Sequence, residues 1–228
     1  MTVHSLHARQ EAPSRWVHLP ALFRPPPREL NSSACAGFVN TSFFMGKIDY
    51  QPIVSLKKQF WSQRLTCASV TIAACYISNR HRTPALTVQN NSVAVTKATN
   101  IASIDTGTNL VGGPANDIAK IYAQVPGSKM GTGGNWMIPC GTEVTVSMSF
   151  GGPQWQMSPA DFNTGLEGSD SMCVGAFFSM PESVFGPPFW IVGDSFLKNV
   201  YSVFRFNPPA VGFAQLSPLA LSMNGVNI

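Results

Sequence analysis

The sequence predicts a mainly β protein with short helices, and three observations lead to this prediction. Its apolar runs are short and are separated by turn residues, with 19 glycines and 18 prolines among 228 residues. Residues 144–150 alternate apolar and polar side chains with the period of a strand. One segment, residues 114–125, has the spacing of a short amphipathic helix. The length suffices for one large β-rich domain or two small ones.

In the first half, strands are expected where apolar residues lie between turn signals. Such runs lie at residues 43–53, 93–95 and 101–104. Pro114 suits the first position of a helix, and apolar side chains then recur on one helical face as far as Val125. Pro126 and Gly127 end this helix.

The second half contains the clearest predicted hairpin. Its first strand is the alternating run 144–150, and Gly151 and Gly152 turn the chain toward Trp155 and Met157. A strand, a short helix and another strand are expected at residues 189–192, 194–199 and 200–206.

Residues 37–217 are expected to form the main domain, with a tail at 218–228. Residues 1–36 are a basic, proline-rich leader that cannot bury enough apolar surface to fold alone, so it is predicted to be disordered or foreign to the fold. No signal peptide is visible in it. Residues 71–87 interrupt what would otherwise be one strand and are predicted to be an insertion. They are either a surface loop or, from Thr71 to Leu86, a translated intron.

Charge and composition exclude several function classes. Residues 1–100 hold 11 Lys and Arg against 3 Asp and Glu, whereas residues 101–228 hold 4 against 8. The formal charge of +4 is therefore a sum of unlike halves, and nucleic-acid binding is not expected. No apolar run is long enough to cross a membrane. All four histidines lie at or before position 81 without ligand-like spacing, so a metal site is not expected.

The cysteines and acceptor sequons favour an oxidising compartment. A disulfide between Cys140 and Cys173 would close a loop and contribute about 3–4 kcal/mol through the unfolded state, as in many secreted proteins. Sequons for N-glycosylation begin at Asn31, Asn40 and Asn90. Three further cysteines leave an odd count, so at least one thiol is unpaired or the chain is not the natural mature form; they are Cys35, Cys67 and Cys75.

The candidate catalytic motif is Asp105-Thr106-Gly107-Thr108, which follows an apolar strand. Alone it is a weak signal, because a carboxylate in a turn commonly caps its own backbone. About 85 residues later the apolar run Trp190–Val192 ends at Gly193, where a glycine lets another segment pass close to the backbone. The sequence Val-Gly-Phe-Ala at residues 211–214 follows.

In this order and spacing the motifs resemble the C-terminal lobe of a pepsin-like aspartic protease, especially the secreted fungal acid proteases. The resemblance covers roughly residues 37–217, apart from the predicted insertion. It implies one lobe of a two-lobed β-barrel fold, with Cys140 and Cys173 where that lobe carries its disulfide. It also implies an aspartic-type endopeptidase that is secreted or vacuolar, acts on polypeptides, is inhibited by pepstatin-type compounds and needs no cofactor.

The resemblance further implies a mechanism. Two aspartates, one from each lobe, share a proton because two close carboxylates cannot both ionise cheaply in a partly desolvated site. One activates a water while the other donates a hydrogen bond to the scissile carbonyl. Asp105 would be the second of this pair. Thr106 and Thr108 would supply hydroxyls to the carboxylate and the bound peptide, and Gly107 would permit the tight turn.

The resemblance also implies supporting roles for three residues near position 193. Val192 and Gly193 would support the active-site loop from below. Asp194 resembles the family's structural carboxylate at a helix N-terminus and is not expected to be catalytic.

The sequence holds one Asp-Thr-Gly and no Asp-Ser-Gly, so the partner aspartate is missing. A single carboxylate lacks the shared proton of the dyad, and the chain alone is predicted not to cleave peptides. One explanation is a truncated or mispredicted gene product. The other is a half-enzyme that becomes active when two copies bring their Asp105 residues together.

A non-catalytic peptide-binding or carbohydrate-binding β-domain is the alternative from another function class. Trp136, Trp155 and Trp190 could then serve as platforms for sugars. However, Trp155 alternates with Met157 and Trp190 lies in an apolar run, which favours burial of both in the core.

Overall fold

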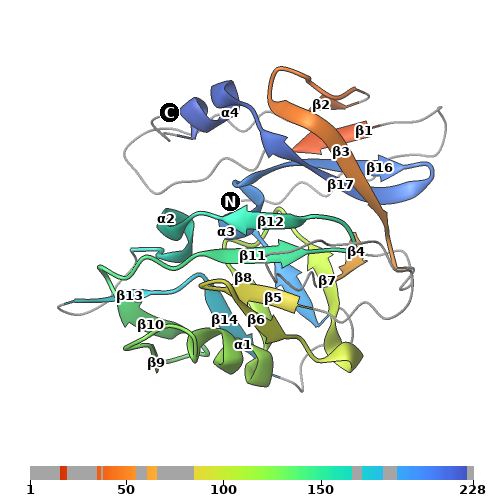
Figure 1. Cartoon of the computed structure of the whole chain (residues 1–228). Helices are drawn as coiled ribbons and strands as arrows, with labels where there is room; N and C mark the ends of the chain where they lie inside the picture. The colour runs from red at the N-terminus through yellow and green to blue at the C-terminus, as the bar shows by residue number, and fades with distance from the viewer. Residues whose placement is uncertain are drawn as a thin grey trace.

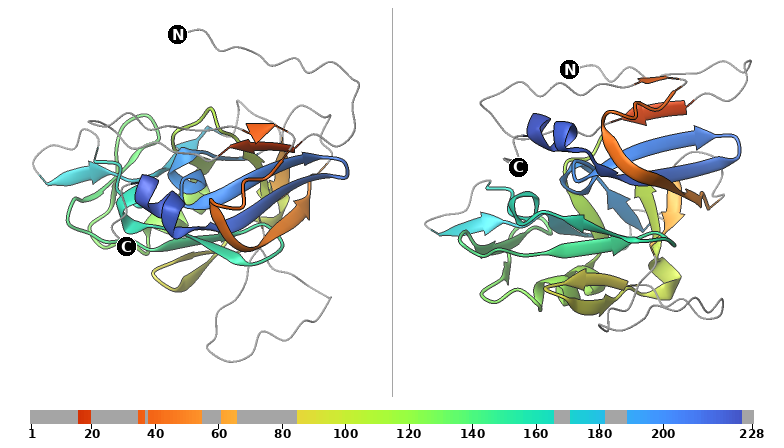
Figure 2. Two further views of the ribbon diagram at one scale, coloured as in Figure 1. Left: turned by 90° about the horizontal axis from the view of Figure 1, so that it is seen from above. Right: turned by 45° about the horizontal axis from the view of Figure 1, so that its top comes forward.

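The computed structural model describes residues 16–19, 35–36, 38–54, 61–65, 85–165, 171–181 and 189–224. Throughout this part of the chain the fold is mainly β, with short helices between the strands, which confirms the predicted class. The strands form four sheets, and in Figure 1 and the right view of Figure 2 the sheet that contains β16 and β17 lies above the rest of the fold.

The first sheet has the strand order β2-β1-β16-β17-β3. Its members are β1 (Trp16–Leu19), β2 (Cys35–Ala36), β3 (Phe44–Pro52), β16 (Val200–Phe206) and β17 (Pro209–Leu216). The centre is the antiparallel hairpin β16–β17. This sheet lies above the hairpin of β11 and β12 in Figure 1 and in the right view of Figure 2.

The second sheet has the order β14-β8-β15-β7-β4. Its members are β4 (Ser62–Arg64), β7 (Ile101–Ile104), β8 (Val111–Pro114), β14 (Phe177–Met180) and β15 (Trp190–Val192). Although β7 and β8 follow each other in the sequence, β15 lies between them, parallel to β7 and antiparallel to β8. The loop from β7 to β8 must therefore cross over the end of β15.

Two smaller sheets complete the fold. One consists of β12 (Gln154–Met157), β11 (Val146–Ser149), β5 (Ala85–Val88) and β6 (Asn91–Ala94), in that order. The other consists of β13 (Met172–Val174), β10 (Trp136–Pro139) and β9 (Lys129–Met130). The antiparallel pairing of β11 with β12 confirms the predicted hairpin.

The described helices are short. They are η1 (Lys97–Thr99), α1 (Ala115–Tyr122), α2 (Pro159–Phe162), α3 (Asp194–Leu197) and α4 (Pro218–Met223). Helix α1 confirms that a helix lies within residues 114–125, because its apolar residues Ile118, Ile121 and Tyr122 are buried as their spacing predicts. It is shorter than predicted: Pro114 is its N-cap and it ends at Tyr122. None of the described helices has the length and apolarity needed to cross a membrane.

Most buried apolar side chains form one large core that draws on all four sheets. Trp190 is fully buried in it and Trp155 packs partly buried against it, so burial in the core describes both better than a surface platform. A second cluster of buried side chains, which includes Tyr201, Val203 and Ala220 of α4, lies on the other face of the first sheet.

The structure describes only parts of the predicted leader and of the predicted insertion. Within the predicted leader 1–36, strands β1 and β2 are described by their backbones, and β1 pairs with β16. Within the predicted insertion 71–87, residues 85–87 belong to β5, which pairs with both β6 and β11, and Leu86 is buried. The rest of both segments lies outside the described residues, as do Asn31, Cys67 and Cys75.

Candidate active site

Asp105 lies directly after β7, where the chain leaves the second sheet. Its backbone N–H donates to the carbonyl of Val192 at 3.0 Å, which extends the pairing of β7 with β15 by one residue. Ile104 before it is buried, whereas Asp105 is half-exposed. The strand pairing thus fixes the backbone while the carboxylate reaches the surface.

Two neighbours in the same loop hold the Asp105 carboxylate. The Gly107 N–H donates to Oδ1 at 2.9 Å, and the Thr108 hydroxyl donates to Oδ2 at 2.8 Å. Each carboxylate oxygen therefore has a fixed donor, and hydrogen bonds to an ionised acceptor are among the stronger ones. Thr106 is exposed at the tip of the loop, so the structure brings Asp105, Gly107 and Thr108 together and leaves Thr106 outside this cluster.

The loop rests on Gly193 at the end of β15. A Cβ at Gly193 would overlap the carbonyl oxygen of Thr108 and come within 2.5 Å of the carbonyl oxygen of Leu110. The Gly193 backbone is extended, so glycine is required here by close approach and not by its conformation. Val192 beside it is buried and pairs with Ile104 on one side and Val111 on the other.

Helix α3 holds the same loop through its first residues. The Asp194 N–H donates to the Thr108 carbonyl at 2.8 Å, and the Ser195 N–H donates to the Asn109 carbonyl at 2.8 Å. The Ser195 hydroxyl donates to the same Asn109 carbonyl at 2.9 Å. Sequence reasoning missed Ser195 and Asn109, because a contact between residues so far apart in the chain leaves no local pattern.

Asp194 is a buried carboxyl close to Asp105. Burial raises its pKa from 3.8 to about 6; nearby Lys198 lowers the pKa, and the charge of Asp105 raises it. Lys198 also forms an ion pair of 2.6 Å with Asp161 on α2. The charge of Asp105 therefore contributes to the raised pKa of Asp194, and the Asp194 backbone supports the Asp105 loop.

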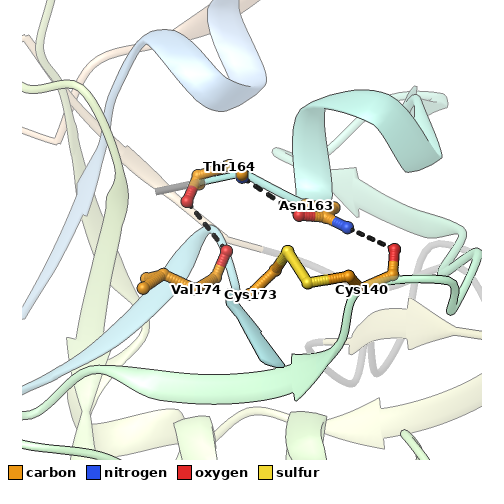
Figure 3. Close-up of a disulfide and its surroundings, with 6 residues drawn as sticks. Cys140, Asn163, Thr164, Cys173 and Val174 are labelled. Carbon is orange, nitrogen blue, oxygen red and sulfur yellow. Dashed lines mark hydrogen bonds between the residues drawn. A yellow bond between two sulfur atoms is a disulfide. The ribbon is translucent and has the colours of Figure 1, made fainter. Parts of the chain in front are cut away.

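The expected disulfide joins Cys140 and Cys173 beside the small sheet of β9, β10 and β13. The Cα atoms are 4.9 Å apart. As Figure 3 shows, the Asn163 side-chain amide donates to the Cys140 carbonyl at 2.8 Å, and the Thr164 hydroxyl donates to the Val174 carbonyl at 2.8 Å. The chain after α2 is thereby attached to both ends of the bridge.

Within the described residues, no three His, Cys, Asp or Glu side chains come together as a metal site would require. Asp105 itself is a half-exposed carboxylate whose orientation is fixed by its two hydrogen-bond donors. Such a group can accept a proton from water or donate a hydrogen bond, depending on its protonation state.

Comparisons with known proteins agree with this geometry. A family model described as eukaryotic aspartyl protease matches residues 22–216. Major aspartyl peptidase 1 of Cryptococcus neoformans var. grubii is 40% identical over 190 residues, which cover 79% of this chain and 35% of the relative. An aspartic protease of Phaffia rhodozyma is 32% identical, over 81% of this chain and 41% of the relative. Human cathepsin D is 24% identical, over 87% of this chain and 44% of the relative. The chain thus spans less than half the length of each of these relatives.

Proposed function

Because the chain belongs to the eukaryotic aspartyl protease family, we propose that it is one lobe of an aspartic-type endopeptidase in which Asp105 is one of two catalytic aspartates. The observation that carries this proposal is the carboxylate of Asp105, half-exposed and fixed by the Gly107 N–H and the Thr108 hydroxyl. Val192, Gly193 and the start of α3 give the loop a rigid base.

The mechanism follows from a second carboxylate facing Asp105. Two such groups at close range share one proton, since ionising both in a partly desolvated site is costly. The ionised member takes a proton from a water as that water attacks the peptide carbonyl, and the protonated member donates a hydrogen bond to the carbonyl oxygen. Loop rigidity matters because this arrangement must be kept within about 0.5 Å.

We further propose that the second aspartate comes from a first lobe, because this sequence holds one Asp-Thr-Gly motif. The chain alone then lacks the shared proton and does not cleave peptides.

Polypeptides are the proposed substrates and pepstatin-type compounds the proposed inhibitors. Secretion or delivery to a vacuole is the proposed destination, supported by the Cys140–Cys173 disulfide, since such bridges persist in oxidising compartments.

The test is to supply the missing lobe. The full chain is refolded together with the portion of the Phaffia rhodozyma aspartic protease that does not align with it. Cleavage of a denatured protein is then measured between about pH 3 and pH 5. This mixture is called the completed enzyme below. Cleavage by the completed enzyme and none by the full chain alone is the expected result.

Sedimentation of the full chain decides between the first lobe and a second copy as the source of the partner aspartate. A monomer that is inactive alone supports the first lobe. A dimer that cleaves the substrate by itself would overturn that part of the proposal in favour of two copies of Asp105. A completed enzyme with no cleavage would contradict the proposed function as a whole.

A further inference from the structure

We propose that Asn90, at the tip of the hairpin between β5 and β6, carries an N-linked glycan. It begins the sequon Asn90-Asn91-Ser92, and it is exposed. Of the three sequons, those at Asn40 and Asn90 lie in the described part of the chain, so their surroundings can be compared directly.

The hairpin presents Asn90 on a tight two-residue turn. Val88 pairs with Asn91, and Gln89 and Asn90 between them have φ values of 52° and 63°. Two consecutive residues with positive φ are typical of the turn that matches the twist of a two-stranded hairpin, and asparagine tolerates this conformation better than most residues. The backbone is therefore compatible with asparagine at this position whether or not a sugar is attached.

Gln89 attaches the turn to the body of the protein and leaves Asn90 outside. The Gln89 side-chain amide donates to the Glu143 carbonyl at 2.8 Å, and its oxygen accepts from the Thr145 hydroxyl at 3.2 Å. The Gln89 backbone N–H donates to the Thr145 carbonyl at 2.9 Å. Asn90 makes no side-chain hydrogen bond to any residue in the described ranges, so its amide nitrogen can bear a sugar without losing a protein contact.

Asn40 has the opposite surroundings. Its side-chain oxygen accepts from the Ser42 N–H at 3.0 Å, and its backbone N–H donates to the Tyr201 hydroxyl at 2.8 Å. Asn40 is half-buried, and the Ser217 hydroxyl donates to the Ser42 carbonyl at 2.7 Å within the same sequon. A glycan on Asn40 would have to fit against this packed turn, whereas one on Asn90 would extend into solvent.

The chemistry is a transfer from a lipid-linked oligosaccharide pyrophosphate in the secretory lumen. The Asn90 amide nitrogen forms a bond to the first sugar carbon and loses a proton, while the bond from that carbon to the pyrophosphate oxygen breaks and the lipid pyrophosphate leaves. The inference rests on the lumenal route proposed above. It does not require catalysis by Asp105, which follows β7 in a different sheet from the one that carries Asn90.

The test uses the full chain, expressed in yeast behind a cleavable secretion leader and collected from the medium. Asn31→Gln is included in every sample, so that the sequon outside the described residues gives no signal. Peptide mass spectrometry, with and without an amidase that removes N-glycans, reports occupancy at Asn40 and Asn90 separately. We expect most molecules to be occupied at Asn90 and few at Asn40.

Matched variants control for folding. Ser92→Ala removes the Asn90 sequon while leaving the two turn residues Gln89 and Asn90 unchanged, and Ser42→Ala removes the Asn40 sequon. Asn90→Asp is a second test that retains a residue tolerant of positive φ. Ser92→Ala and Asn90→Asp should each abolish the mass shift of one glycan, and Ser42→Ala should leave it unchanged.

The Cys140–Cys173 disulfide and Asp105→Asn separate this inference from the proposed function. A secreted protein in which the disulfide has formed has passed through the lumen, so an unoccupied Asn90 in that protein would overturn the inference. Occupancy of Asn40 with Asn90 unmodified would also overturn it. Glycosylation of the Asp105→Asn variant at the wild-type level is expected, because the modification is independent of proteolysis.

Discussion

The backbone of Gly193 lies directly against the carbonyl of Thr108, beneath the loop that carries Asp105. The Asp194 N–H donates to that carbonyl at 2.8 Å, and the Thr108 hydroxyl donates to the Asp105 carboxylate at 2.8 Å. Thr108 thus connects the end of β15 with the carboxylate of Asp105, the candidate catalytic group. The position of the carboxylate therefore depends on how closely two distant parts of the chain can approach.

Gly193→Ala should destabilise the full chain by about 1–3 kcal/mol, because the added methyl overlaps backbone atoms that cannot rotate away. The free energy of unfolding, measured by urea denaturation with tryptophan fluorescence, gives the value. Gly141→Ala is the matched control, since a Cβ at Gly141 meets nothing within 4 Å. Equal effects of the two substitutions would contradict the close approach at Gly193.

Thr108→Val should destabilise the full chain by about 1 kcal/mol, because it retains the side-chain shape but removes the donor to Asp105 Oδ2. Thr108→Ser retains the hydroxyl and should cost less. The same substitutions in the completed enzyme should lower the rate of cleavage for valine more than for serine. A valine variant as stable and as active as the serine variant would show that this hydrogen bond has no role.

Asp194→Asn should change how stability depends on pH. The pKa of Asp194 rises from 3.8 to about 6 on folding, so the folded chain binds more protons between these values. The resulting contribution to stability is fully present below about pH 3.8 and is lost as the pH rises through about 6. Relative to the wild type, the Asn variant should therefore become steadily more stable between about pH 4 and pH 7.

Urea denaturation at several pH values tests the Asp194 prediction, with Glu143→Gln as the control at an exposed carboxylate. The control shows the effect of removing a surface carboxylate elsewhere in the chain. A difference between Asp194→Asn and wild type that stays the same at every pH would mean that burial does not perturb Asp194.

Tyr122→Phe should cost about 1–3 kcal/mol of stability. The buried Tyr122 hydroxyl donates to the Phe177 carbonyl at 2.8 Å and accepts from the Phe177 N–H at 3.1 Å, so its loss leaves two buried backbone groups without this partner. The ring stack on Trp136, with centroids 4.8 Å apart, should persist. Faster hydrogen exchange at the Phe177 amide accompanies the loss, and unchanged exchange would argue against the bridge.

Local patterns predicted the elements whose burial is periodic. The hairpin β11–β12 follows from alternation that buries Val146 and Met148, and α1 follows from apolar spacing that buries Ile118 and Ile121. The candidate active-site loop could be located because its motif, and the apolar run ending at Gly193, are each visible in short stretches of sequence.

The rest depends on contacts between distant residues, which leave no period. The insertion of β15 between β7 and β8 joins Val192 to both Ile104 and Val111. The bond from Ser195 to Asn109 likewise joins positions 86 residues apart. Strand β5 was missed because its short apolar run follows directly on Arg82 and Pro84, which read as parts of an interruption.

The measurement that tests the central claim most directly is the cleavage rate of the completed enzyme carrying Asp105→Asn, compared with Glu143→Gln. Loss of a positioned acid–base group should lower the rate by about 10²–10⁴-fold or more, while the control retains the wild-type rate. A variant at Asp105 that cleaves as fast as the control would show that this carboxylate is not a catalytic aspartate.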